Sequence, residues 1–316
     1  MNKKLTNILM VSFSIISLSS CYKSPNLQGY ENNKQVNTVF KMNKDNNSDF
    51  TLNKLKIDDS KDIITGFKNQ EAIETFSVDI GPIESQDNKK QGWGLGPDRN
   101  EKGQPIDAVN FQEKYGKYDA YFIGNSGKKN IYFTFDEGYE NGYTAPILDI
   151  LKEKNVSAVF FVTQHYAVKN PDLIKRMIDE GHIIGNHSSK HKSFPKISIE
   201  ECKEEVKGLH EYMKENYNYE MDLFRFPCGE FSEKTLELLC KMGYKSVFWS
   251  FSYADYDENK QLSCDKAKEK ILTSMYDDSI LLLHAVSKTN TEVLGEVIDK
   301  FRENGYNLSL LNFENK

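Results

Sequence analysis

Hydrophobic residues in the second half of the chain occur in short runs separated by longer amphipathic stretches. Runs of this length and spacing predict buried strands that alternate with helices. We expect seven strands, at residues 131–135, 158–162, 182–185, 223–226, 246–250, 279–283 and 308–311. The run at 279–283 is almost wholly apolar, which is typical of a parallel strand covered on both faces.

The segments between these runs carry residues that begin and end helices. A Ser with a Glu three residues later forms a capping box, Pro favours the first helical position, and Gly ends a helix. These signals are Asn170-Pro171 with Gly181, Ser198 with Glu201, Ser232 with Gly243, and Gly305 after a helix at 291–304.

Strands alternating with helices predict a parallel α/β sheet, and the pattern fits both an open doubly wound sheet and a barrel. In either architecture ligands bind at the carboxyl ends of the strands. Polar residues that directly follow a predicted strand are therefore candidates for a functional site.

The N-terminus has the features of an export signal. Lys3 and Lys4 precede an uncharged stretch at residues 8–18, which is too short to span a membrane. The stretch ends in Leu-Ser-Ser-Cys, and this resembles the bacterial lipobox, in which Cys21 is lipidated. The alternative is an ordinary secretory signal with an incidental cysteine, and both alternatives predict export.

Composition changes again before the strand-rich region. Residues 22–62 are rich in Asn, Lys, Asp and Ser, so they predict a flexible linker, and no hydrophobic pattern supports a separate small module. We expect a signal peptide at 1–21, this linker, an N-terminal extension at 63–128 and a catalytic domain at 129–316. The later part of the extension has aromatic residues with which to dock: Trp93, Phe111, Tyr115, Tyr118, Tyr121 and Phe122.

Charge and cysteine content exclude some classes of function. The formal net charge of the 316 residues is −6, so the chain lacks the basic surface that nucleic acid binding requires. Cys202, Cys228, Cys240 and Cys264 form no CxxC pair, and we expect packed thiols, with one or two disulfides left open.

Five predicted strands lead directly into residues that can do chemistry. Asp136 and Glu137 follow the first strand, His187 and His191 follow the third, and Arg225 ends the fourth. Asp255 follows the fifth strand, and His284 follows the sixth. Because the carboxyl ends of parallel strands meet at one rim, we expect these side chains to lie together.

Two histidines four residues apart can each offer a nitrogen to one zinc ion, at ~2.0–2.1 Å. One carboxylate of the Asp136-Glu137 pair can complete the site while the other accepts a proton, and a water in the open position would become acidic. His284 is suited to protonate a leaving nitrogen, and a backbone N–H of the turn after Arg225 could hold an oxyanion.

Taken singly, each residue also has an ordinary structural interpretation. The histidines could lie on the surface, the Asp-Glu pair could form a solvated turn, and His284 could be a satisfied core residue. Arg225 could pair with Asp222 or Glu230. Their shared position at the ends of predicted strands favours the functional interpretation.

Four motifs in order resemble those of the polysaccharide deacetylases, carbohydrate esterase family 4. They are Thr-Phe-Asp-Glu-Gly at 134–138, His-Ser-Ser-Lys-His at 187–191, Arg-Phe-Pro-Cys-Gly at 225–229 and Leu-Leu-His at 282–284. The resemblance covers residues 92–313 and implies the NodB-type fold, a distorted (β/α) barrel of about seven parallel strands.

The resemblance also implies roles for individual residues. It places the catalytic base on Asp136, the metal ligands on His187 and His191, and the general acid on His284. It also implies that Arg225 orients the base and that the carboxylate of Asp255 tunes the acid histidine. It further implies a divalent metal, which we expect to be zinc.

Three positions depart from the family pattern. Glu137 stands where the family has an aspartate ligand, and we expect it to be the third metal ligand. Cys228 replaces a frequent tyrosine, but the oxyanion role belongs to the backbone N–H there. Tyr256 stands where the family usually has tryptophan.

The stretch at 136–144, with Gly-Trp-Gly at 92–94 and residues 283–287, is most similar to the delta-lactam-biosynthetic de-N-acetylases. The implied substrate is N-acetylmuramic acid in a peptidoglycan glycan strand whose stem peptide an amidase has removed, on the way to spore-cortex muramic delta-lactam. We place Tyr139 and Asn141 of this stretch among the substrate-contacting residues.

Two alternatives remain open at the level of sequence. The first is deacetylation of N-acetylglucosamine in peptidoglycan or a chitin-like polymer. The second is a non-catalytic wall-binding lipoprotein, which the altered Glu137 permits. All three interpretations place the protein outside the cytoplasm, and we expect it to be anchored to the membrane through lipidated Cys21.

Overall fold

The structure is a computed structural model that describes residues 80–311, and these belong to one compact unit. The expected signal peptide, the linker at 22–62 and the first part of the extension, residues 63–79, lie outside the described residues. No helix in the described part of the chain is long and apolar enough to cross a membrane.

The main sheet is parallel throughout, in the order β10-β3-β4-β5-β6-β8-β2, and β9 also pairs with β3 outside this order. Its strands are β2 (Ala120–Tyr121), β3 (Asn130–Glu137), β4 (Val159–Val162), β5 (Ile183–Asn186), β6 (Leu223–Phe224), β8 (Lys245–Val247), β9 (Ser279–Leu283) and β10 (Asn307–Leu308). A separate antiparallel pair joins β1 (Gln91–Gly92) to β7 (Glu230–Phe231).

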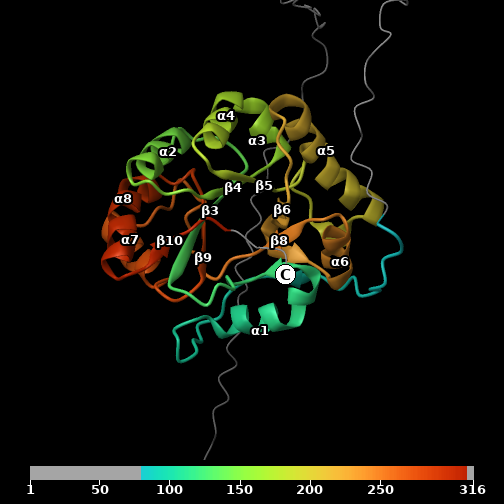
Figure 1. The fold of residues 1–316 in the computed structure, drawn as a ribbon, viewed down its shortest axis with the longest axis horizontal. Helices are drawn as coiled ribbons and strands as arrows, with labels where there is room; N and C mark the ends of the chain where they lie inside the picture. The colour runs from blue at the N-terminus through green and yellow to red at the C-terminus, as the bar shows by residue number, and fades with distance from the viewer. Residues whose placement is uncertain (1–79, 312–316) are drawn as a thin grey trace, which may run out of the picture. The chain divides into compact units, whose positions relative to one another are not determined.

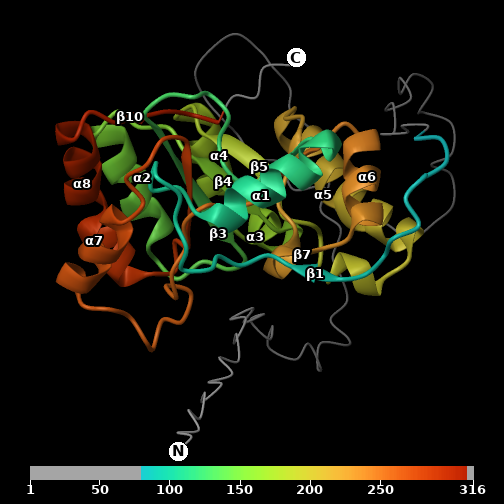
Figure 2. The same cartoon turned by 90° about the horizontal axis from the view of Figure 1, so that it is seen from below.

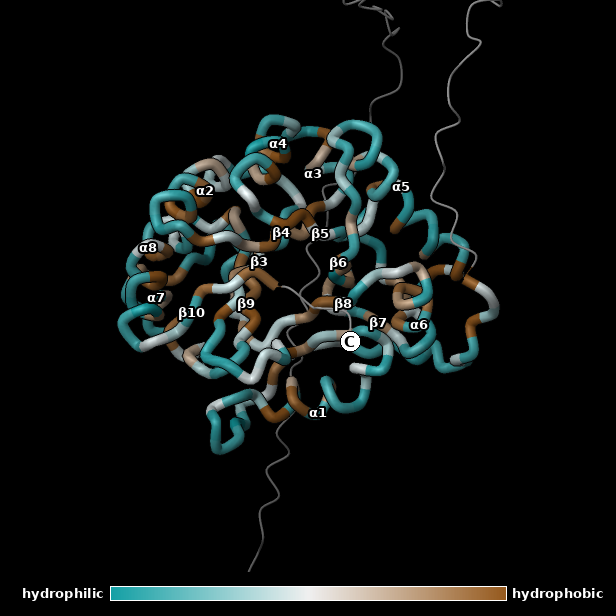
Figure 3. The backbone as a smooth tube through the Cα atoms, in the orientation of Figure 1, coloured by the Kyte–Doolittle hydropathy of each residue, from teal (hydrophilic) through white to brown (hydrophobic). Residues whose placement is uncertain are grey.

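The helices surround these strands (Figure 1). They are α1 (Ile106–Tyr115), α2 (Thr144–Glu153), α3 (Gln164–Lys169), α4 (Pro171–Asp179), α5 (Ile199–Tyr217), α6 (Glu233–Lys241), α7 (Cys264–Leu272) and α8 (Lys288–Glu303). Short 3-10 turns lie at η1 (Gly116–Tyr118), η2 (Phe194–Lys196) and η3 (Pro227–Gly229). Figure 3 shows hydrophobic strands inside and largely polar helix surfaces outside.

The sheet curls until its two sides meet. After β8 the chain reaches β9, where Phe251 pairs with Leu281 and the Ser250 N–H donates to the Ile280 carbonyl at 2.9 Å. This arrangement confirms the expected distorted barrel of parallel strands. All seven expected strands are present, and β2 from the N-terminal extension adds a further one beside β8.

Several element boundaries differ from those expected, for local reasons. β6 ends at Phe224 because the chain turns toward Pro227, and β8 ends at Val247 because the following residues pair with β9. Helix α8 begins at Lys288, three residues earlier than expected, because the Ser287 hydroxyl accepts the Asn290 N–H at 3.0 Å. The capping box at Ser198 is present as expected.

The described part of the N-terminal extension, residues 80–128, is called the lead-in here, and it packs against the barrel through aromatic rings. Phe122 stacks on Phe248 with ring centroids 4.2 Å apart, and Trp93 lies edge-on to Phe122 at 4.7 Å. The Trp93 indole N–H also donates to the Trp249 carbonyl at 2.9 Å. With α1 lying across this side of the barrel (Figure 2), the lead-in is part of the core.

Candidate active site

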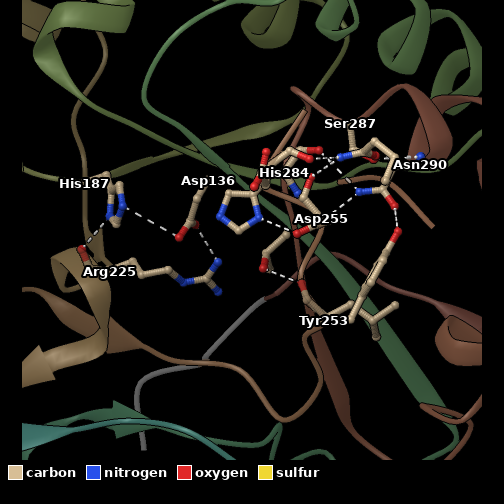
Figure 4. A network of polar contacts seen from close by, with 12 residues as sticks. Asp136, His187, Arg225, Tyr253, Asp255, His284, Ser287 and Asn290 are labelled. Atoms are coloured by element: carbon tan, nitrogen blue, oxygen red, sulfur yellow. Dashed lines mark hydrogen bonds and ion pairs between the residues drawn. The ribbon is translucent and has the colours of Figure 1, made fainter. Parts of the chain in front are cut away.

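The residues expected at the strand ends gather at one rim of the barrel. Asp136 lies near the end of β3, and Arg225 follows β6 directly. Figure 4 shows Asp136 between His187 and His284, with the Arg225 side chain beneath. The convergence follows from the parallel sheet, because its strands all deliver their carboxyl ends to the same edge.

Arg225 is fully buried and holds Asp136. Its Nη1 donates to Asp136 Oδ1 at 2.8 Å, while Nε and Nη2 donate to the carbonyls of Val247 and Phe248 at 3.0 and 3.1 Å. The guanidinium also lies 4.1 Å from the centroid of the Phe161 ring. The alternative pairing of Arg225 with Asp222 or Glu230 is wrong, because those carboxylates pair with lysines.

The surroundings of Asp136 keep it ionised. Burial alone would raise the pKa of its carboxyl, but Arg225, His187 and His284 outweigh burial and lower the pKa. The free oxygen, Oδ2, lies 3.7 Å from His187 Nε2. Asp136 is therefore an ionised acceptor with one oxygen fixed and the other facing the imidazoles.

The two histidines of the 187–191 loop point their Nε2 atoms at each other, 3.2 Å apart. His187 Nδ1 lies 2.8 Å from the Arg225 carbonyl, which can only accept, so Nδ1 carries the proton and Nε2 has a free lone pair. Burial lowers the pKa of both imidazoles, that of His191 to about 3, with His187 also lowering it. Both rings are neutral near pH 7, as metal ligands must be.

This loop has an unusual backbone, which helix α5 supports. Ser188 and His191 have φ values of 69° and 54°, in the left-handed region that few non-glycine residues adopt. The buried Glu205 of α5 accepts the Lys190 N–H through its carboxylate at 2.7 Å and the Ser189 N–H through its carbonyl at 2.9 Å. These bonds hold the loop in the shape that brings the two imidazoles together.

Glu137 does not join this pair. Neighbouring residues of a strand point to opposite faces, so when Asp136 faces His187 the side chain of Glu137 points away. Its carboxylate is fully buried with no hydrogen-bond partner for either oxygen, and burial, then Glu140 and Asp136, raise its pKa well above the ordinary value. The described residues contain no cluster of three His, Cys, Asp or Glu side chains placed to hold a metal.

The imidazole pair nevertheless fits a divalent cation. Two neutral nitrogens converge, one of them with its tautomer set by a carbonyl, and a carboxylate oxygen lies beside them. Nitrogen and carboxylate donors suit zinc and similar metals.

His284 lies on the other side of Asp136 and is held by Asp255. Its Nδ1 donates to Asp255 Oδ1 at 2.7 Å, and its backbone N–H donates to Oδ2 at 2.8 Å. Burial lowers the pKa of His284, and nearby Arg225 lowers it further. The carboxylates of Asp255 and then Asp136 favour the imidazolium more strongly, so the pKa of His284 is raised. The Tyr256 ring stands edge-on to the imidazole at 5.9 Å. His284 can therefore carry a proton at neutral pH.

The three residues expected to contact substrate lie in the loops of this rim. Cys228 has φ 58° inside η3, so its peptide is turned out of regular structure. Asn141 donates to the Val286 carbonyl at 3.1 Å, which joins the loop after β3 to the loop after β9. Tyr139 lies two residues before it, with its hydroxyl oxygen buried.

Sequence reasoning missed Asn290 and Tyr253, which extend the Asp255–His284 pair (Figure 4). The available signal was the spacing Ser287-x-x-Asn290, a helix start. The sequence analysis predicts a helix from 291, so Asn290 falls outside the expected helix.

Comparisons with known proteins agree with this geometry. A family model described as polysaccharide deacetylase matches residues 123–247. The peptidoglycan-N-acetylmuramic acid deacetylase PdaA of Bacillus subtilis is 39% identical over 225 residues, which cover 71% of this chain and 85% of that protein.

Two solved structures share the fold. The structure of Bacillus subtilis PdaA, a family 4 carbohydrate esterase, has a TM-score of 0.66 at 37% identity, and the match covers 70% of this chain and 94% of that one. A family 4 carbohydrate esterase from Bacillus anthracis has a TM-score of 0.58 at 41% identity, and the match covers 71% of this chain and 94% of that one. The chain therefore belongs to the polysaccharide deacetylases, the family 4 carbohydrate esterases, which hydrolyse N-acetyl amides.

Proposed function

We propose that this protein is a metal-dependent peptidoglycan N-acetylmuramic acid deacetylase. The observation that carries the proposal is the meeting, at one rim, of a converging imidazole pair, an arginine-held carboxylate and an aspartate-held histidine. The substrate class rests on the likeness to PdaA over 71% of the chain.

His187 and His191 would hold a divalent cation, which we propose to be zinc. Such a cation supplies Lewis acidity, polarising the acetamide carbonyl and acidifying water. We keep Glu137 as a proposed third ligand, which requires the chain at the end of β3 to rearrange so that the buried carboxylate reaches the imidazoles. Metal content of the Glu137→Ala variant, compared with wild type after identical loading, tests this role.

The chain's own residues would carry the proton transfers. Asp136 accepts the proton of the attacking water while Arg225 holds its other oxygen, and an N–H of the turn at Cys228 faces the developing oxyanion. His284 then gives its proton to the amine nitrogen as the carbon–nitrogen bond breaks, leaving acetate and a free amine. Tyr139 and Asn141 are proposed to contact the sugar.

The test is mass spectrometry of defined glycan strands, with and without stem peptides, after treatment with residues 80–316. Loss of acetyl from muramic acid in peptide-free strands is the expected result. Loss from N-acetylglucosamine instead would favour the alternative substrate. If neither acetate nor bound metal is found, the non-catalytic wall-binding alternative holds.

Asp136→Asn should lower kcat by about 100- to 10,000-fold, because an amide cannot accept the proton. Acetate release and circular dichroism together measure this effect. A folded variant with wild-type kcat would refute the assignment of the base.

We further propose export and membrane anchoring through lipidated Cys21, with action on the cell wall in the spore-cortex delta-lactam pathway after an amidase. Cys21→Ser should release the protein from the membrane fraction. Unchanged membrane partition of this variant would remove the lipid anchor from the proposal.

A further inference from the structure

Asn290 occupies the third position of α8 and is only 2% exposed. A polar residue at this position often reaches back to the N-cap backbone. Here the Asn290 backbone N–H is satisfied by Ser287, as in an ordinary cap, but the side chain bonds elsewhere. Its hydrogen bonds therefore have a purpose beyond starting the helix.

Both hydrogens of the Asn290 amide go to the Asp255–His284 pair. Nδ2 donates to Asp255 Oδ2 at 2.6 Å and to the His284 carbonyl at 3.3 Å. A carboxylate accepts and does not donate, so the amide nitrogen must face Asp255. The amide oxygen then faces Tyr253, whose hydroxyl donates to it. The acceptors Asp255 and His284 thus set the orientation of the amide, and the Tyr253 hydroxyl holds it there.

Asp255 consequently accepts three hydrogen bonds: two from His284 and one from Asn290. These bonds leave the carboxylate little freedom to rotate. His284 then keeps its proton on Nδ1, and its other nitrogen lies on the side of Asp136 (Figure 4). A displacement of about 1 Å in a catalytic group can cost on the order of 100-fold in rate.

We propose that Asn290, held in place by Tyr253, is a positioning residue that holds Asp255 and thereby aims the acid histidine, His284, at the reacting amide. The inference rests on the proposed function, because it takes His284 as the acid. The proposed role of both residues is to position Asp255 and His284, through the bonds of the Asn290 amide.

Asn290→Leu removes both donors while nearly keeping the size and shape of the side chain. We expect kcat to fall by about 10- to 100-fold with KM within about twofold of wild type. The alkaline limb of the pH–kcat profile should move to lower pH, because a poorly held Asp255 supports the imidazolium less. Tyr253→Phe removes only the hydroxyl that holds the Asn290 amide. It should show a smaller loss of kcat and a smaller shift of the alkaline limb.

The matched control is Thr291→Val, in the same helical turn. The Thr291 hydroxyl donates to the Ser287 carbonyl at 3.1 Å and takes no part in the Asp255 network. This variant should keep wild-type kcat and pH profile, so a loss in Asn290→Leu cannot be assigned to a weakened helix start.

A second readout is independent of turnover: the imidazole ¹⁵N shifts of His284 without substrate, in wild type and the variants, at a pH high enough for the ring to be neutral. We expect a single Nδ1–H tautomer in wild type and a mixture in Asn290→Leu. If wild type releases no acetate, the proposed function fails while these spectra still test the positioning. The inference would be overturned if Asn290→Leu kept the kcat, the pH profile and the His284 tautomer of wild type. Should that variant unfold, the same result in Tyr253→Phe would overturn it.

Discussion

Arg225 is the most constrained side chain of the site, because one guanidinium satisfies two carbonyls and one carboxylate without reaching solvent. A lysine has the same charge but only one nitrogen, and it cannot reach all three acceptors. The residue therefore links the position of Asp136 to the barrel wall.

Arg225→Lys should lower kcat by about 10- to 100-fold and the free energy of unfolding by at least about 2 kcal/mol. Acetate release and urea unfolding measure the two effects. Arg302→Lys, at an exposed arginine that donates to the Lys154 carbonyl, is the control and should change neither. Equal kcat and equal unfolding free energy in the two variants would mean that the three hydrogen bonds of the Arg225 guanidinium are dispensable.

Buried His182 lies far from the chemistry and makes stability depend on pH. It accepts the Ala158 N–H through Nδ1 at 3.1 Å, and burial lowers its pKa to about 4. The unfolded chain has the ordinary value near 6.5, so it binds the proton first as pH falls. The stabilisation from neutral His182 is complete above pH 6.5 and is lost toward pH 4.

His182→Asn keeps an acceptor near the Ala158 N–H and removes the titration. Between pH 6.5 and 4 the variant should lose less unfolding free energy than wild type, by at most about 3 kcal/mol. Urea unfolding at several pH values measures how the free energy of unfolding changes with pH, and this slope is unaffected by any constant packing cost. Equal slopes in wild type and variant would exclude His182 as a source of acid sensitivity.

At the scale of elements, two glycines show how differently a strand and a helix are packed. A Cβ on Gly185 in β5 would meet the Phe161 ring at 2.4 Å, so β4 and β5 require a residue without a side chain there. A Cβ on Gly295 in α8 would make only ordinary contacts, the nearest at 3.5 Å to Lys154.

Gly185→Ala should destabilise the protein by about 1–3 kcal/mol through overpacking. Gly295→Ala should stabilise it by about 0.5–1 kcal/mol, because alanine favours the helix. Thermal unfolding of the two variants side by side provides the measurement. Changes of the same sign would contradict the packing described for β5.

On the scale of the whole molecule, the N-terminal lead-in is an integral part of the barrel core. Trp93, Phe111 and Phe122 cover rings of the barrel itself, and β2 adds to the sheet. The boundary expected between residues 128 and 129 therefore passes through one shared core.

A chain that starts at residue 123 should lose cooperative unfolding and bind hydrophobic dyes, because Phe231 and Phe248 would be exposed. A chain that starts at residue 80 retains the lead-in and should unfold in one transition. Calorimetry and dye binding compare the two. A cooperative, dye-free chain from residue 123 would show that the lead-in is dispensable.

The sequence by itself determined the seven expected strands and their alternation with helices, the parallel sheet and the strand ends at which chemistry collects. Hydrophobic periodicity and capping are local, so they can be read from neighbouring residues, as at Ser198 and the strand at 279–283. The family motifs added the barrel and the roles expected of Asp136 and His284, which spacing alone left open.

Only the tertiary structure decided which groups meet. Strand alternation turned Glu137 away from the imidazoles, Arg225 chose Asp136 over its sequence neighbours, and Asn290 reached Asp255 across 35 positions. Such pairings depend on how the sheet curls and on where one helix begins. Both are set by packing between distant segments, which no local pattern contains.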